Sequence, residues 1–135
     1  MRKAMMPLAG ISFGLILFQG ASGWANVSGS EMGHAHTAHL LTLVAIAAAV
    51  VAVKGEFPKQ SKVKPHAFAL AGLAVLQEGI GSGLMKSDWS WGWLHVMVAL
   101  VMAGHSFALL MLTRMALAAE ADGDSDAGAE IGPAE

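Results

Sequence analysis

Cysteine is absent from this chain of 135 residues. Without thiols the protein can form neither a disulfide framework nor a thiolate metal or redox centre. Any bound metal ion must therefore take its protein ligands from histidine, methionine and carboxylate side chains. The sequence offers six histidines and nine methionines for that purpose.

Charged side chains are scarce as well. They make up 13 % of the residues, against 55 % that are hydrophobic, and the mean hydropathy is +0.55. This apolar content exceeds what a soluble domain of this size can bury, so we expect a lipid bilayer to surround the protein. The sequence has no Ser/His/Asp arrangement and no phosphate-binding loop. We therefore expect neither an enzyme nor a nucleic-acid-binding protein.

Four apolar stretches predict helices that cross a membrane. Residues 4–18, 38–53 and 91–112 contain no Asp, Glu, Lys or Arg, and residues 67–85 contain a single acid. A helix of about 17 to 25 residues spans a bilayer, and the stretches lack the alternating pattern of barrel strands. The predicted fold class is an all-α membrane protein, with a small bundle of transmembrane helices in residues 38–115. We place the three helices at 38–53, 66–85 and 90–113.

The chain begins with the features of a signal peptide. Residues 1–25, MRKAMMPLAGISFGLILFQGASGWA, have a basic start, an apolar centre of the length of a secretory h-region, and small residues at Gly23 and Ala25. We expect cleavage after Ala25, which leaves three transmembrane helices. If these residues instead remain as an uncleaved signal anchor, the bundle has four helices.

The basic residues predict the orientation in the membrane. If the four apolar stretches cross in alternating directions, seven of the eight basic residues fall on one side, which the positive-inside rule makes cytoplasmic. The protein is then a multi-pass protein of a bacterial inner membrane. The histidine-rich segment 26–37 faces the periplasm, and the acidic tail 116–135 is predicted to be disordered in the cytoplasm.

Half of the histidines lie in a short segment at the start of the second apolar stretch, EMGHAHTAHLLTL (31–43). On a helix Met32, His36 and His39 share one face, because they are spaced i, i+4 and i+7. His34 can add a further imidazole from the end of the helix. Imidazole binds Cu, Zn, Ni and Co, and a thioether favours Cu(I). The segment is either a transition-metal site or a loosely ordered histidine tract that binds metal adventitiously.

A stripe of polar and aromatic side chains marks the last apolar stretch. Four residues fall within about 80° of arc on a helix: Trp91, His95, Met102 and His105. At about 1.5 Å of rise per residue, His95 and His105 are about 15 Å apart along the axis, too far to share one ion. An ionisable group in mid-membrane is a functional candidate that faces the bundle interior. The alternative is that each imidazole only fixes helix packing through a hydrogen bond.

Glu78 is the acid within the third apolar stretch. It lies about 18 Å along the helix from His66, which we interpret as a residue at the cytoplasmic boundary. The glycines of GIGSG (79–83) would allow the helix to end here and place Gln77 and Glu78 in a wet outer vestibule. The alternative is that both side chains are ordinary polar flanks at the membrane surface.

The predicted function is to bind or transport a transition-metal ion, with copper as the first candidate and Zn, Ni or Co as alternatives. The candidate metal ligands are Met32, His34, His36, His39, Glu78, His95, Met102 and His105. A second hypothesis places a non-covalent haem b between His39 and His95, because small helical bundles can hold haem iron with one histidine from each of two helices. A third is that the chain is a small accessory or anchor subunit of a larger, respiratory-type membrane complex.

Partners follow from the small size of the predicted bundle. Three short helices expose most of their surface. Besides the lipid bilayer we therefore expect either a second copy of the chain or a larger membrane protein to cover part of it.

Overall fold

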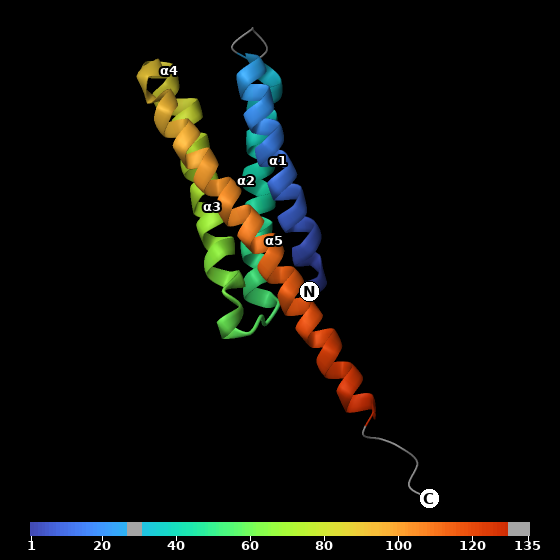
Figure 1. Ribbon diagram of the computed structural model, residues 1–135. Helices are drawn as coiled ribbons and strands as arrows, with labels where there is room; N and C mark the ends of the chain where they lie inside the picture. The colour runs from blue at the N-terminus through green and yellow to red at the C-terminus, as the bar shows by residue number, and fades with distance from the viewer. Residues whose placement is uncertain (27–30, 130–135) are drawn as a thin grey trace, which may run out of the picture.

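The computed structural model describes residues 1–26 and 31–129 (Figure 1). These residues form helices joined by short turns and contain no strand, which confirms the all-α fold class. In this part of the chain four helices are long and apolar enough to cross a membrane, which is consistent with a multi-pass membrane protein. They are α1 (Met5–Asn26), α2 (Glu31–Lys54), α3 (Val63–Gly79), whose apolar span continues to Leu84, and α5 (Gly92–Ala129).

Short helical segments connect the long ones. The 3-10 turn η1 (Arg2–Ala4) precedes α1, and η2 (Lys59–Ser61) lies in the turn between α2 and α3. The π-helical segment η3 (Ile80–Leu84) and the short α4 (Met85–Ser87) extend α3, and η4 (Trp89–Trp91) leads into α5. The GIGSG stretch, whose glycines would allow the helix to end, therefore continues as a wider helical turn with i→i+5 hydrogen bonds.

The long helices pack in a ring. α1 lies against α2 and α5, and α3 lies against the same two helices. Successive helices run in opposite directions, so the start of the chain and the turn between α2 and α3 lie at one end, which we call the inner end (Figure 1). The other end, which we call the outer end, holds α4, the C-terminal part of α1 and the N-terminal part of α2.

Small residues fill the contacts between helices. Ala45, Ala48 and Ala52 of α2 are fully buried. Alanine at such positions lets helix backbones approach closely, which is how helices associate where lipid removes the hydrophobic driving force. Large apolar side chains such as those of Leu43 and Leu100 are more than half exposed. An outer surface of this kind suits contact with lipid chains.

The N-terminal boundary of α2 differs from the sequence-based prediction. The helix begins at Glu31, whereas we predicted a start at residue 38. Residues 31–37 are mostly polar, but their backbone carbonyls can still accept the hydrogen bonds of the helix, and an apolar run marks only the part of a helix that lipid can cover. Residues 27–30 of the predicted periplasmic segment lie outside the described residues.

The C-terminal boundary of α5 also lies beyond the predicted end at residue 113. The helix continues to Ala129, although we predicted disorder from residue 116 onward. Alanine has the highest helix propensity, and alanines recur throughout 116–129, so the helix extends past the apolar stretch. Residues 130–135 of the predicted tail lie outside the described residues.

Candidate functional site

Two histidines from different helices face each other near the outer end. The ring centres of His34 on α2 and His95 on α5 are 6.1 Å apart, with 53° between the ring planes. We call them the outer histidine pair. The Ser22 hydroxyl of α1 lies 3.2 Å from Nδ1 of His34. The Nδ1 atom of His95 is buried, and no described residue offers it a hydrogen-bond partner.

The backbone around the outer histidine pair is held by two glutamines. Gln19 of α1 donates from its Nε2 to the carbonyl oxygen of His34 at 2.9 Å and to the hydroxyl of Thr37 at 2.6 Å. Gln77 of α3 donates to the carbonyl oxygen of His95 at 3.0 Å. Each imidazole is therefore carried by a turn of helix that a neighbouring helix fixes.

Glycines make room for both imidazoles of the outer pair. A Cβ placed on Gly23 would lie 3.2 Å from Cε1 of His34, and one placed on Gly81 would lie 3.1 Å from Cε1 of His95. Both distances are shorter than ordinary van der Waals contact. Gly81 lies in the π-helical segment η3, and such segments often occur at functional sites because they re-aim the adjoining turns.

Glu78 bonds to α2 through both of its carboxylate oxygens. Its Oε1 lies 2.6 Å from Nδ1 of His39, and its Oε2 accepts a hydrogen bond of 2.8 Å from the hydroxyl of Thr42. The side chain of His39 is 61 % exposed and that of Glu78 is 28 % exposed. The carboxylate therefore ties α3 to α2 at the border of the exposed surface and places a negative charge on the outer half of the bundle.

A second pair of facing histidines lies closer to the inner end. The Nδ1 atoms of His66 on α3 and His105 on α5 are 3.0 Å apart, and the ring centres are 5.0 Å apart. We call them the inner histidine pair. Sequence reasoning treated His66 as a boundary residue, because a single histidine after Pro65 carries no periodic signal. Only the packing of α3 against α5 reveals its partner.

The remaining predicted ligands are Met102, His36 and Met32. Met102 of α5 is 1 % exposed and belongs to the buried core, and His36 is exposed on α2. The side chain of Met32 lies outside those described. Among the side chains that the structure describes, no three from His, Asp or Glu are close enough to hold one metal ion together. The structure thus arranges the predicted ligands as pairs, with His34 facing His95 and His39 bonded to Glu78.

A polar turn at the outer end sets the start of α5. Asp88 accepts a hydrogen bond of 2.9 Å from the backbone N–H of Ser90. This bond, together with one from the Ser90 side chain, holds the pKa of Asp88 below its ordinary value. The turn fixes the point from which α5 carries His95 toward the bundle.

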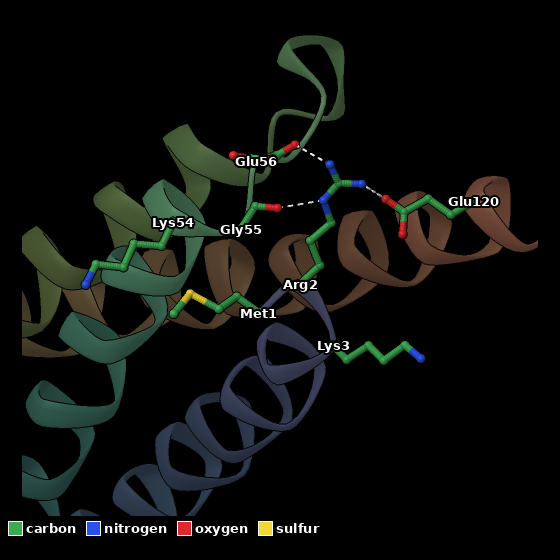
Figure 2. Close-up of a pocket in the computed structure, with 7 residues that line it drawn as sticks. All are labelled: Met1, Arg2, Lys3, Lys54, Gly55, Glu56 and Glu120. Carbon is green, nitrogen blue, oxygen red and sulfur yellow. Dashed lines mark hydrogen bonds and ion pairs between the residues drawn. The ribbon is translucent and has the colours of Figure 1, made fainter.

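The inner end carries a groove of about 560 Å³, shown in Figure 2. Arg2 donates to the carbonyl oxygens of Gly55 and Glu56, each at 2.6 Å, and forms an ion pair with Glu120. The residues that line the groove are Met1, Arg2, Lys3, Lys54, Gly55, Glu56 and Glu120. The guanidinium is thus bonded on three sides, and Arg2 joins the start of the chain to the turn that follows α2 and to α5.

Comparison of the chain with protein-family models, with curated proteins and with solved structures finds no match. The function is therefore inferred from the side chains and their geometry.

Proposed function

We propose that this protein is a bacterial inner-membrane protein that binds a transition-metal ion at the outer histidine pair, with Cu(I) as the first candidate and Zn, Ni or Co as alternatives. One observation carries the proposal. His34 and His95 face each other from separate helices, and the buried Nδ1 of His95 has no hydrogen-bond partner among the described residues. A buried polar atom without a partner costs free energy, and a bound ion would supply the missing partner.

The spacing of the two rings supports a shared ion. With a metal–nitrogen bond of about 2.0 Å and a ring centre about 1.1 Å behind the nitrogen, two imidazoles on one ion have ring centres about 5 to 6.2 Å apart. The observed separation is 6.1 Å, near the wide end of that range. A wide angle at the metal suits Cu(I), which is stable at low coordination number and accepts soft ligands such as a methionine sulfur.

The negative charge of Glu78 favours a cation at the same end of the bundle. Its carboxylate is partly exposed and is oriented by His39 and Thr42. A partly buried acid attracts cations more strongly than one in bulk water. In the proposed site Glu78 raises the local cation concentration, while His34 and His95 provide the ligand atoms.

We further propose that α1 remains part of the mature protein, which gives the uncleaved, four-helix alternative. Met5 and Ser12 of α1 are fully buried against the other helices. Gln19 and Ser22 of α1 hold the turn that carries His34. Cleavage after residue 25 would remove these contacts and expose one side of the proposed site.

The orientation follows the charge distribution. The inner end holds Arg2, Lys54 and the turn between α2 and α3, which is rich in lysine, and the positive-inside rule makes that end cytoplasmic. The outer histidine pair then lies on the periplasmic side. A metal ion would reach it from the periplasm, where free thiols do not compete for it.

Haem b is the second candidate ligand. Facing imidazoles from two helices also suit the two axial positions of haem iron, and a separation of 6.1 Å fits them. The second axial ligand beside His95 would then be His34 and not the predicted His39, since His39 bonds to Glu78. The haem would be held without covalent attachment because the chain has no cysteine.

The test is a metal analysis of the whole chain, purified in detergent without a histidine tag. We expect one ion at the outer pair that is lost in His34→Gln and in His95→Gln. The matched control is His36→Gln, which removes an exposed imidazole two residues from His34 and should leave that ion in place. Loss of the ion in His36→Gln alone would move the site to the exposed histidines of α2. A Soret band would select haem b, and neither metal nor haem would leave only the accessory-subunit hypothesis.

A further inference from the structure

The inner histidine pair is a polar contact in the apolar part of the bundle that the proposed site does not use. His66 and His105 are both partly buried and belong to α3 and α5. Ionisable groups inside a membrane protein are costly, and they usually face the bundle interior and mark ion or proton paths. Here a hydrogen bond between the two Nδ1 atoms joins them.

The distance between the two nitrogens fits a metal ion. On a tetrahedral ion with metal–nitrogen bonds of about 2.0 Å, two ligand nitrogens lie about 3.3 Å apart. The Nδ1 atoms of His66 and His105 lie 3.0 Å apart. If the bridging proton moves from Nδ1 to Nε2 of the same ring and the two nitrogens separate by about 0.3 Å, both Nδ1 atoms can serve as ligands of one ion. The ring centres, at 5.0 Å, also match the narrow end of the range for two imidazoles on one ion.

The two histidine pairs share helix α5. His95 and His105 are ten residues apart, which is about 15 Å along the helix axis. Met102 lies between them, 1 % exposed, three residues from His105 on the same face of α5. A methionine sulfur is a soft ligand and its flexible side chain adapts to several positions. The stretch between the two pairs therefore holds a buried donor atom of the kind that Cu(I) prefers.

We propose that the inner histidine pair is a second binding site for the same transition-metal ion, so that the bundle holds two ions at two depths along α5. This inference rests on the proposed metal-binding function and deepens it. Two sites at different depths would let the bundle hold an ion at successive positions between the two sides of the membrane. The outer pair receives the ion and the inner pair holds it near the cytoplasmic side.

The experiment counts copper in four versions of the whole chain. They are the native protein, the outer variant His34→Gln/His95→Gln, the inner variant His66→Gln/His105→Gln, and the variant with all four changes. Each is loaded with excess Cu(I) without oxygen, freed of unbound copper and analysed by mass spectrometry. Glutamine keeps a hydrogen-bonding group at each position. The helix content by circular dichroism shows whether a variant has folded, and single changes replace any double variant that has not.

We expect two copper ions in the native chain, one in each double variant and none in the quadruple variant. If the native chain holds one ion that the outer variant loses and the inner variant keeps, the inner site is refuted and the proposed function stands. If the one ion is instead kept by the outer variant and lost by the inner variant, the outer site is refuted. If the native chain binds no copper, both the outer and the inner site are refuted as Cu(I) sites. If all four versions bind the same number of copper ions, neither histidine pair is the binding site.

Discussion

Gly81 lies against the imidazole of His95 so closely that a Cβ on Gly81 would stand 3.1 Å from its Cε1. The two residues come from η3 and α5. The absence of a side chain at position 81 is what allows α5 to carry His95 to its place facing His34. The contact joins the π-helical turn of the chain to the proposed metal site.

Gly81→Ala should therefore weaken metal binding. The added methyl group displaces the His95 ring by a few tenths of an ångström, and we expect about a threefold to tenfold loss of affinity, or about 0.7 to 1.4 kcal/mol. The matched control is Gly83→Ala, since a Cβ at Gly83 meets nothing within 4 Å. Competition with a coloured copper chelator measures both affinities. Equal affinities for the two variants would show that Gly81 does not position the site.

The protein isolated from membranes should retain its first 25 residues. The buried face of α1 packs on the bundle, Ser106 of α5 bonds to the carbonyl oxygen of Ala9, and the rings of Phe13 and Phe107 lie 5.8 Å apart. Intact-mass spectrometry of the chain made without a tag should give the full 13.9 kDa. A mass that corresponds to a start at Asn26 would demonstrate cleavage and a bundle without α1.

Glu78→Ala should destabilise the outer half of the bundle. The change removes the acceptor for His39 and for Thr42. Since the contact with His39 is partly exposed, we expect a loss of about 1 to 2 kcal/mol in the free energy of unfolding. Unfolding with sodium dodecyl sulfate in mixed micelles measures it. Ser82→Ala, which removes only an exposed hydroxyl bonded to the Glu78 carbonyl oxygen, should change stability by less than about 0.5 kcal/mol. A stability of Glu78→Ala equal to that of this control would contradict the assigned tie between α2 and α3.

Asp88 should make the protein less stable in acid. The hydrogen bond from the backbone N–H of Ser90 lowers the pKa of Asp88 in the folded state below its ordinary value of 3.8. The ionised carboxylate therefore stabilises the fold fully at pH values above 3.8, and this contribution is lost as the pH falls through the lower folded-state pKa. Thermal unfolding at pH 7 should show the native protein to be more stable than Asp88→Asn, and the difference should shrink toward pH 3. A difference that does not depend on pH would rule out this role of the charge.

Ala48→Leu should disrupt the packing of α2. Ala48 is fully buried, and a larger side chain there forces the helices apart at a cost of about 1 to 3 kcal/mol. Val50→Leu, at a position that is 48 % exposed on the same helix, should cost less than about 0.5 kcal/mol. The same unfolding titration compares them. Equal effects would mean that the buried face of α2 is not the one described.

The sequence anticipated much of the candidate site one helix at a time. The 3.6-residue period placed His95, Met102 and His105 on one face of the last helix, and the buried Met102 agrees with an inward-facing stripe. The period could not show that His66 belongs with His105, because these residues are 39 positions apart on different helices. It also could not place Gln19 and Ser22 beside His34, since they lie in a stretch that looked like a signal peptide.

By itself the sequence determined that this protein is all-α and that its long helices can cross a membrane. The physical reason is that apolar composition and run length decide whether a segment can lie in lipid, and a lipid-exposed backbone must bond within its own helix. Only the tertiary structure decided which imidazoles face each other and which carboxylate oxygen meets which donor. Those relationships depend on the crossing of helices and on their relative heights, and these are set where alanine and glycine let one helix backbone approach another.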